Sequence, residues 1–570
     1  GLATSSGQGT ATITAASASI TSSTTISVAQ ATISSIAVTP SSTSIRSEYT
    51  QQFTAIATYS DGSSQDITQS ATWISSSPEI ASVNFTGLAT GMLAGTTTVS
   101  ASSGSVTGST SLTVSTTQSA NPNAPLFGLH IQSISTPLPT IGFNEVRLWS
   151  DVSSTRWAQI NKSKGAYNFS TVDSFLAEFY GAGITDVVYT FGQVPKWASR
   201  NPSDSACDFA TSSSLYGGCD LPTDINIDGT GTDQTFINFV TAIATHVNDP
   251  TYLMTHAHIR YWEPWNEWYR NNVVNTHTWV NYSVRASYAQ MVRMVEDVRC
   301  TITGTGTVNG IPCTATPIDP TAQIVSPSDG ANSCCSSPQV FQNFLYCNGT
   351  GANAPISGSY CTTGSAGSAA VDIINSHWYE GQGREPEELI TDVPVYTSVL
   401  SSTDLSKPLW SDEGSWNDDT YVPDPDIQAS WVARYYLVGW STKLVRIYWY
   451  AYDSTLYGTL WTSTDGPDPA GQAYSTVYNW VVGSTLTIPC AKSSGTIWTC
   501  GIKLANGISA EAIWDTSQTC SDGSCTTRNQ NVSSSWTSYQ DLNGTDHAVT
   551  TIGSVPVGIQ PILLTSSSIP

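Results

Sequence analysis

The chain is poor in charge, and above all in positive charge. Its 570 residues include 20 Lys and Arg against 43 Asp and Glu, which gives a formal net charge of −23. Proteins that bind nucleic acid or anionic membranes need Lys and Arg to neutralise phosphate groups. We therefore expect neither nucleic acid nor a membrane surface as a partner, whereas neutral ligands such as glycans are compatible with the composition.

Long apolar runs and metal-binding cysteine patterns are also missing. No run approaches the ~20 residues that span a bilayer, so membrane insertion is not expected. No two cysteines form a C-x-x-C pair and no Cys/His cluster has zinc spacing, so the sequence predicts no metal site and no cofactor. We expect the acidic residues Asp412, Asp418, Asp419, Asp424 and Asp426 to belong to a solvated loop rather than to a metal site.

The 12 cysteines occur in close pairs along the chain. An even number in Ser- and Gly-rich loops indicates short disulfide loops formed in an oxidising compartment, and hence a secreted, extracellular or cell-surface protein. The expected pairs are Cys207–Cys219, Cys300–Cys313, Cys490–Cys500 and Cys520–Cys525. Cys334 and Cys335 are left to pair with Cys347 and Cys361, in an order that the sequence leaves open.

The first residues of the chain resemble a later segment. Residues 9–21 (GTATITAASASIT) align with residues 95–107 (GTTTVSASSGSVT), and both alternate apolar and small polar side chains as half-buried strands do. Repeated short strands are typical of Ig-like sandwiches. Residues 1–32 are therefore either a partial Ig-like repeat, carrying its last two strands, or a Ser/Thr-rich linker. Unpaired strands here would offer an edge for self-association.

Residues 33–115 form a complete unit of short strands separated by turns. The segments IAVTP (36–40), FTAIATYSDG (53–62), WISSSPEIASV (73–83) and GTTTVSA (95–101) resemble the bacterial Ig-like domain of group 2. The resemblance implies a β-sandwich of the kind that spaces or anchors surface and secreted proteins. Residues 116–125, which follow, are a linker by composition.

Between residues 126 and 483, apolar runs of strand length alternate with amphipathic helical patterns. The eight runs are 126–130, 145–149, 186–191, 257–262, 322–326, 371–378, 408–412 and 444–450. Continuous apolar runs are typical of a parallel sheet that is buried on both faces, and eight alternations predict a (β/α)8 TIM barrel. Residues 484–570 return to short strands, which predict a small C-terminal antiparallel β-sandwich on the barrel.

Two glutamates follow or end strands of this predicted barrel. Glu267 comes after the fourth strand, beside Asn266, and Glu413 ends the seventh. Active groups of such barrels lie at the carboxyl ends of the strands. Retaining glycosidases need two carboxyl groups ~5–5.5 Å apart, one as acid/base and one as nucleophile. We assign Glu267 as general acid/base and Glu413 as nucleophile.

Other strand ends supply the remaining candidates. Arg147 could hold Glu413 ionised, or it could pair with Glu145 or Asp151 instead. His377 could act in the same way or be a structural histidine. A sugar would be contacted by an amide, by a tyrosine beside Glu413 and by tryptophans, although tryptophans also fill cores. These substrate-binding candidates are Asn266, Arg147, His377, Tyr379, Trp449, Trp265, Trp197 and Trp416.

Three segments at these strand ends carry a family resemblance: YWEPWNE (261–267), VDIINSHWY (371–379) and PLWSDEGSW (408–416). They resemble the clan A glycoside hydrolases, which carry Asn-Glu after strand four and Glu after strand seven, and are most similar to family 39 and its relatives, which include β-xylosidases and endo-acting hydrolases. The resemblance implies a retaining enzyme for β-linked polysaccharides or oligosaccharides, or for α-L-arabinofuranosides in sister families. The alternative is a glycan-binding surface adhesin or filament subunit with an inactive barrel.

Overall fold

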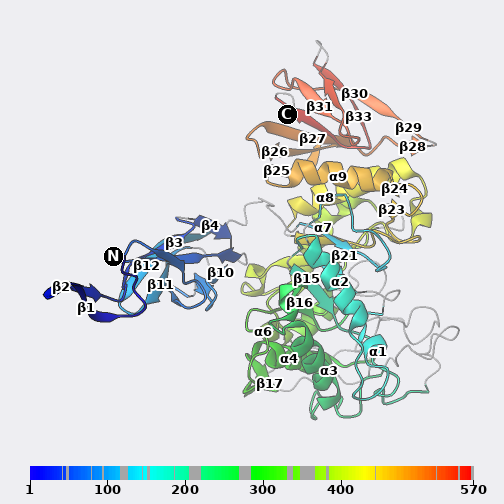
Figure 1. Cartoon of the computed structure of the whole chain (residues 1–570). Coiled ribbons are helices and arrows are strands. Elements are labelled where there is room, and N and C mark those ends of the chain that lie inside the picture. Colours follow the sequence, from blue (N-terminus) through cyan, green and yellow to red (C-terminus); the bar gives the residue numbers. More distant parts are fainter. Residues whose placement is uncertain are drawn as a thin grey trace. The chain divides into compact units, whose positions relative to one another are not determined.

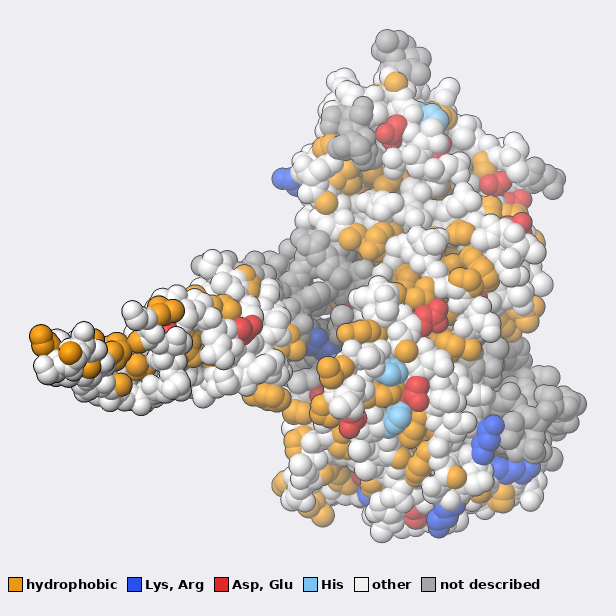
Figure 2. Space-filling model, viewed as in Figure 1, with side chains coloured by type: hydrophobic (Ala, Val, Ile, Leu, Met, Phe, Trp, Pro, Cys, Tyr) orange, Lys and Arg blue, Asp and Glu red, His pale blue; other side chains and the backbone are white. Residues whose placement is uncertain are grey.

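The chain divides into two compact units, Gly1–Ser119 and Ala120–Pro570 (Figure 1). The computed structural model describes residues 1–41, 43–46, 50–78, 80–92, 95–115, 126–143, 145–149, 154–184, 186–203, 220–268, 284–329, 338–346, 366–380, 384–442, 444–521, 523–549 and 553–566. Among these residues no helix is both long and apolar enough to cross a membrane. The visible surface carries few charged side chains (Figure 2), as expected for a chain with 11% charged residues.

The amino-terminal segment folds as a two-stranded hairpin. β1 (Gly9–Ser17) pairs with β2 (Ile20–Val28), and Gly9 lies opposite Val28. The pairing repeats that of β11 (Gly95–Ser103) with β12 (Val106–Ser115), where Gly95 lies opposite Val114. The two segments that align in sequence therefore also form hairpins with the same strand register. That residues 1–32 are a partial Ig-like repeat stays a prediction.

The Ig-like unit is a sandwich of short sheets. β3 (Ile33–Thr39), β6 (Thr54–Tyr59) and β7 (Ser64–Asp66) form one sheet, and β5 (Thr50–Gln52), β10 (Leu88–Gly91) and β9 (Ala81–Val83) form another. β4 (Thr43–Arg46), β12, β11 and β8 (Thr72–Ser75) form the third. The core lies between them around Phe53, Trp73 and Leu112, all of which are buried. The predicted alternation of buried and exposed side chains is confirmed, as in β11.

The second unit is built on a closed ring of eight parallel strands. They are β13 (Phe127–His130), β14 (Glu145–Leu148), β15 (Asp186–Thr190), β16 (His258–Glu263), β19 (Gln323–Ile324), β20 (Ile374–Asn375), β21 (Leu409–Gly414) and β22 (Leu444–Trp449). Each of these strands pairs with the next one in the series except β19 with β20, and β22 pairs with β13. A parallel bridge between Val325 and Ile373 joins the β19 and β20 sides. The predicted (β/α)8 barrel is confirmed, and each predicted strand overlaps an observed one.

Helices surround this ring. They are α1 (Trp157–Ile160), α2 (Ser170–Gly181), α3 (Gln234–Val247), α4 (Tyr288–Thr303), α5 (Pro338–Tyr346), α6 (Gly367–Ala370), α7 (Leu389–Thr397), α8 (Pro425–Ser441) and α9 (Pro469–Val481). Phe236, Phe239, Val240 and Ile243 of α3 are fully buried, as their shared face predicted. Burial of such a stripe supplies most of the stability of a helix in a protein.

Antiparallel sheets follow the barrel and lie against α8 and α9 (Figure 1). The larger sheet runs β25 (Thr485–Ser494), β26 (Ile497–Lys503), β27 (Ser509–Asp515), β34 (Ile562–Thr565), β31 (Ser538–Gln540) and β32 (Asp546–Ala548). β30 (Thr527–Asn531) pairs with β33 (Ser554–Gly558), and a small core joins the two sheets around Ile513, Val557 and Leu564. The predicted C-terminal β-sandwich is confirmed.

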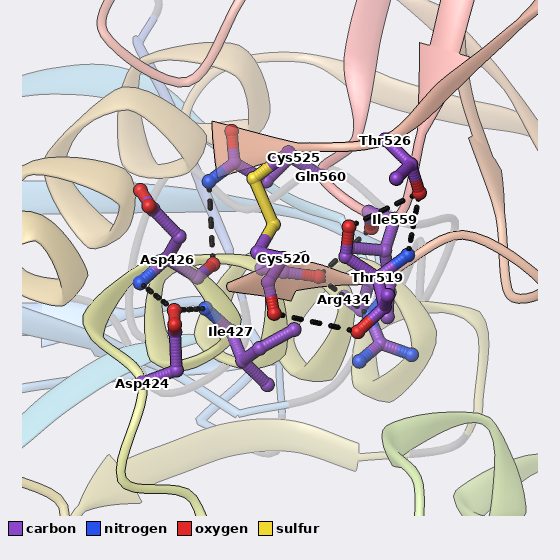
Figure 3. The surroundings of a disulfide bond; sticks show 11 residues. Asp424, Asp426, Ile427, Arg434, Thr519, Cys520, Cys525, Thr526, Ile559 and Gln560 are labelled. Carbon is purple, nitrogen blue, oxygen red and sulfur yellow. Dashed lines mark hydrogen bonds between the residues drawn. A yellow bond between two sulfur atoms is a disulfide. The ribbon is translucent and has the colours of Figure 1, made fainter. Parts of the chain in front are cut away.

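Helix α8 is one point of attachment for these sheets. Ser430 Oγ donates to the carbonyl of Ile559 at 2.8 Å. Gln560 donates to the carbonyl of Asp426 at 3.2 Å (Figure 3). Cys520 and Cys525 close a small loop, joining β28 (Cys520–Ser521) to β29 (Ser524–Cys525), beside these contacts (Figure 3). The C-terminal sheets are therefore packed into the same compact unit as the barrel.

Three of the expected disulfides are present in the described part of the chain. Cys300 is bonded to Cys313, Cys490 to Cys500 and Cys520 to Cys525. The predicted Cys207–Cys219 bond and the cysteines 334, 335, 347 and 361 lie outside the described residues. These three bonds confirm the prediction that cysteines close in sequence pair with each other.

Candidate active site

The two predicted catalytic glutamates lie close together at the carboxyl ends of the barrel strands. One side-chain oxygen of Glu267 and one of Glu413 lie within 4.8 Å of each other and of a His377 ring nitrogen. Nδ1 of His377 lies 3.1 Å from Glu267 Oε1 and 3.3 Å from Glu413 Oε2. Both glutamates are 5% exposed and are therefore largely shielded from water.

Glu413 is held by two hydrogen-bond donors. Arg147 Nη1 donates to Glu413 Oε1 at 2.6 Å, and the Tyr379 hydroxyl donates to Oε2 at 2.8 Å. Both donors are buried, and hydrogen bonds from a charged or hydroxyl donor to a carboxylate are short and strong. The Glu413 carboxyl group is thus fixed in place at both oxygens.

Glu267 is positioned by an uncommon backbone conformation. Its φ of +40° lies in the left-handed region, which costs free energy for a residue with a Cβ. The backbone N–H of Glu267 donates to Ser328 Oγ at 3.1 Å, and the Ser328 N–H in turn donates to Glu263 at 3.1 Å. The loop after β16 is thereby tied to the end of β19, and it carries the Glu267 side chain toward Glu413.

Arg147 links this pair to a buried layer of charge beneath it. Its guanidinium contacts Glu263 at 2.5 Å and Asp412 at 2.8 Å, and donates to Asn266 Oδ1 at 2.6 Å. The Asn266 oxygen is therefore occupied, so its NH2 group is the part left to donate to a ligand. Arg147 is shared among several carboxylates rather than assigned to Glu145, which contacts Arg446 at 3.4 Å.

One sequence expectation is wrong for Asp412. We placed it in a solvated acidic loop, but it lies in β21 and is fully buried. Its Oδ1 is 3.0 Å from His377 Nε2. His377 therefore has a carboxylate at each ring nitrogen, and the chain Asp412–His377 reaches both glutamates.

Burial and pairing shift the titration of these groups. Burial by itself would lower the pKa of His377, but the carboxylates of Glu413 and Asp412 raise it to about 10. Burial would raise the pKa of Asp412, but Arg147 and His377 hold it well below its usual range. Burial raises the pKa of Glu263 to about 8, against the effect of Arg147. At neutral pH His377 is thus expected to be a charged imidazolium and Glu263 to be protonated.

The structure does not bring the predicted tryptophans to the two glutamates. Trp449 is fully buried, and its ring lies against Tyr435 and Tyr436 of α8. Trp416 is also fully buried and contacts Trp449, and Trp265 is 1% exposed. Side chains of a strand alternate between the two faces of the sheet, and Trp449 points outward toward the helices.

Trp197 is half-buried, and its indole N–H donates to the carbonyl of Asn161 at 2.7 Å. Among the described residues, no hydrogen bond or ring contact joins it to Glu267 or Glu413. Its place in a sugar site stays a prediction.

Tyr450, one residue beyond Trp449, is a site residue that the sequence reading missed. Its ring lies 5.0 Å from that of His130 and 6.5 Å from that of Tyr379, and its hydroxyl accepts a hydrogen bond from Gln132 at 2.7 Å. It is half-buried, so an aromatic face could reach a ligand. Counting alternate positions from Tyr448, which is in the barrel interior, would have found it.

Two sets of side chains here could offer three ligand atoms to a metal ion. They are Glu263, His377 and Asp412, and Glu267, His377 and Glu413, each with ligand atoms within 4.8 Å. Both sets need a neutral imidazole, because a protonated ring has no lone pair for a metal. The raised pKa of His377 therefore opposes metal binding at neutral pH.

Comparison with known proteins identifies the amino-terminal domain. Residues 32–114 match the family described as bacterial Ig-like domain (group 2). These residues are a bacterial Ig-like domain. Ice-binding protein 1 of Shewanella frigidimarina (strain NCIMB 400) is 52% identical over 64 residues, which cover 11% of this chain and 7% of that protein. The match thus spans a small part of that relative.

Structural neighbours of the chain include three glycoside hydrolases. A family 39 enzyme from the gut symbiont Bacteroides cellulosilyticus WH2 is 14% identical, with a TM-score of 0.48, over 93% of this chain and 99% of that one. A GH30 endoxylanase from Clostridium papyrosolvens C71 is 14% identical, with a TM-score of 0.44, over 79% and 97%. A GH10 xylanase with a bacterial Ig-like domain, from termite gut, is 12% identical, with a TM-score of 0.36, over 76% and 97%. These values are too low to say anything of activity, which has to be inferred from the site.

Proposed function

We propose that the barrel is a secreted retaining glycoside hydrolase that cleaves β-glycosidic bonds of a polysaccharide or oligosaccharide. The supporting observation is the pair of glutamates whose oxygens lie within 4.8 Å at the carboxyl ends of the strands. Retaining enzymes place their two carboxyl groups ~5–5.5 Å apart, whereas inverting enzymes leave ~6.5–9.5 Å for a water molecule. The short separation favours double displacement.

The contacts of each glutamate support separate roles. Glu413 accepts hydrogen bonds from Arg147 and Tyr379, as suits a nucleophile that must be held in position. Its oxygen attacks the anomeric carbon while the bond to the leaving oxygen breaks, and Glu267 gives its proton to that oxygen. In the second step Glu267 takes a proton from water, the water oxygen bonds to the same carbon, and the ester bond to Glu413 breaks. Two inversions leave the product with net retention.

Substrate contacts are assigned to the groups around this pair. The NH2 group of Asn266 would donate to a sugar hydroxyl next to the reacting carbon, because its oxygen is occupied by Arg147. Tyr450 takes the sugar-platform role that we first gave to Trp449, since its ring is half-buried beside Tyr379. The disulfides and the Ig-like domain fit an extracellular protein.

Azide rescue tests the roles of the two glutamates. We expect Glu413→Ala and Glu267→Ala each to lose more than about a thousandfold of kcat on β-linked aryl glycosides and polysaccharides. Azide should rescue Glu413→Ala with an inverted glycosyl azide and Glu267→Ala with a retained one, because the anion replaces a different group in each. Glu178→Gln, on a half-buried glutamate of α2, is the matched control and should keep full activity.

The alternative, a glycan-binding adhesin with an inactive barrel, makes a different prediction. The hairpin β1–β2 supports this alternative. Its side chains are almost all exposed, and its strand edges could pair with a strand of another chain. If wild type cleaves no member of a panel of β-glycans, yet binds one with an affinity that the two glutamate variants retain, the hydrolase assignment is wrong.

A further inference from the structure

The loop that leads into α3 carries a second pattern of acidic residues, outside the active site. Asp224, Asn226 and Asp228 alternate along it and Gly229 follows, which gives D-x-N-x-D-G. Calcium-binding loops of the EF-hand type begin with this spacing, and in them alternate side-chain oxygens and one backbone carbonyl surround Ca²⁺. The twelfth position of such a loop usually holds Glu; here it holds Thr235, and the nearest carboxylate is Asp233, two residues earlier.

The loop has the tight turn that this pattern requires. Gly229 has φ of +77°, and a Cβ there would lie 2.7 Å from the carbonyl oxygen of Ala289. Asp224 caps the start of α3 with one oxygen, Oδ2, which accepts from the N–H and hydroxyl of Thr235 at 2.8 Å. Its other oxygen, Oδ1, is buried and accepts no hydrogen bond from any described residue.

Asp233 is the residue that points to a ligand. Its side chain is fully buried, and neither of its carboxylate oxygens accepts a hydrogen bond within the described part of the chain. Its one hydrogen-bond partner is another acid, the carboxyl group of Asp297 of α4, and it also lies in the field of Asp224. A buried carboxylate without a donor or cation is strongly disfavoured, so such groups are paired or coordinate metals.

The nearest basic side chain is already engaged. Arg293 of α4 contacts Asp297 at 2.8 Å, and its remaining donors point to the carbonyl oxygens of Gly229, Gly231 and Thr232. One positive charge thus faces three acids, namely Asp224, Asp233 and Asp297. The cluster therefore holds negative charge that Arg293 does not neutralise.

We propose that residues 224–235 bind Ca²⁺, with Asp233 and the buried oxygen of Asp224 among its ligands. Side-chain oxygens of Asn226 and Asp228, both at the loop surface, would complete the set. Within the described structure, these acids do not form a set of three with ligand atoms within 4.8 Å, so the ion has to draw the loop oxygens inward. Binding should therefore be accompanied by ordering of this loop and by an increase in stability.

The site would support one wall of the barrel without taking part in the reaction. Arg200, after β15, donates to the carbonyls of Pro222 and Ile225, and Ser287 at the start of α4 donates to the carbonyl of Ile227. The loop thus joins segments that follow the third and fourth strands. The proposal does not depend on the roles of Glu267 and Glu413.

Calcium titration of the full chain tests the proposal without an activity assay. Protein treated with EDTA and dialysed is titrated with CaCl2 in a calorimeter, and its Tm is measured with CaCl2 and with MgCl2. We expect one ion per chain, a Kd of about 10⁻⁵–10⁻³ M as in extracellular modules, and a higher Tm with Ca²⁺ than with Mg²⁺. Asp233→Asn and Asp224→Asn should each weaken binding at least about tenfold, a loss equal to one charged ligand contact.

Asp249→Asn is the matched control, because Asp249 accepts from the Thr251 N–H in a similar turn at the other end of α3. It should bind Ca²⁺ as wild type does. Absence of heat and of any Tm change in wild type would overturn the proposal. So would unchanged binding by Asp233→Asn or Asp224→Asn, or an equal response to Mg²⁺.

Discussion

The active site and the loop before α3 both bury acidic side chains, but they neutralise them differently. At the active site Arg147 and His377 lie among four acids, and each of these acids forms an ion pair with one of the two. In the loop cluster Arg293 is shared with three backbone carbonyls, and Asp233 has only another acid, Asp297, as its hydrogen-bond partner among the described residues. The first cluster is complete in the protein itself, whereas the second is balanced only if something is added.

The difference teaches that burial of charge has opposite consequences in the two places. Removing one member of a complete network leaves an uncompensated charge behind and is strongly destabilising. Removing the unpaired member of an incomplete network relieves a cost instead. Four predictions test this difference between the two clusters.

Arg147→Met should have the largest effect. It would leave Glu263, Asp412 and Glu413 without their shared cation, and we expect the free energy of unfolding of the barrel to fall by about 3–5 kcal/mol. Urea unfolding followed by tryptophan fluorescence measures this loss. Arg528→Met, which removes a half-exposed pair with Asp515, is the control and should cost under about 1 kcal/mol. If both variants lose the same free energy of unfolding, the network around Arg147 is no more sensitive than an ordinary surface ion pair.

His377→Gln should change how stability depends on pH. The folded pKa of His377 is about 10, above the usual 6.5, so its contribution is fully present below pH 6.5 and is lost as pH rises to 10. Wild type should therefore exceed the variant by about 4 kcal/mol at pH 6.5 and lose most of this advantage by pH 10. Unfolding curves at pH 6.5, 8 and 10 measure it, and a constant difference would show that no proton is involved.

Tyr379→Phe should reduce activity without much loss of stability. It removes one hydrogen bond to Glu413, and a bond to a charged group corresponds to about 10–100-fold in kcat/KM. Steady-state kinetics on an aryl β-glycoside would detect this. Tyr180→Phe, on an exposed tyrosine of α2, is the control. If the kcat/KM of Tyr379→Phe equals that of wild type, the Tyr379 hydroxyl plays no part in the reaction.

Asp233→Asn should have the smallest effect on stability, and with the opposite sign to the others. Burial and the neighbouring Asp297 raise the pKa of Asp233, and replacing this carboxyl group by a neutral amide should leave the free energy of unfolding in EDTA unchanged or raised by about 1 kcal/mol. Asp412→Asn, in the complete network, should lower it. If both variants lose the same amount in EDTA, the two clusters do not differ in the way described.

Much of this architecture could be predicted because the physical signal is strong in the sequence. Eight continuous apolar runs gave the barrel strands, since parallel strands buried on both faces need apolar residues throughout. Glu267, Glu413, Arg147 and His377 could be placed at one rim because carboxyl ends of parallel strands share an edge of the barrel.

Because these strands are apolar throughout, the sequence did not show which of their side chains point into the barrel and which point toward the helices. In β22 nearly every residue is buried, so no polar alternation distinguishes the inward Tyr448 from the outward Trp449. Trp449 was therefore assigned to the site, and Tyr450 was passed over. Asp412 was misjudged for a related reason, because a carboxylate inside a barrel depends on partners that are remote in sequence, such as Arg147.

The order of strands in the C-terminal sheet has a consequence for synthesis of the protein. β34, within residues 562–565, is not an edge strand but lies between β27 and β31. A ribosome must therefore add almost all of the described chain before that sheet can close over α8. Until then Ser430 and Asp426 of α8 lack the partners that Ile559 and Gln560 supply, so this face of the barrel unit is completed last.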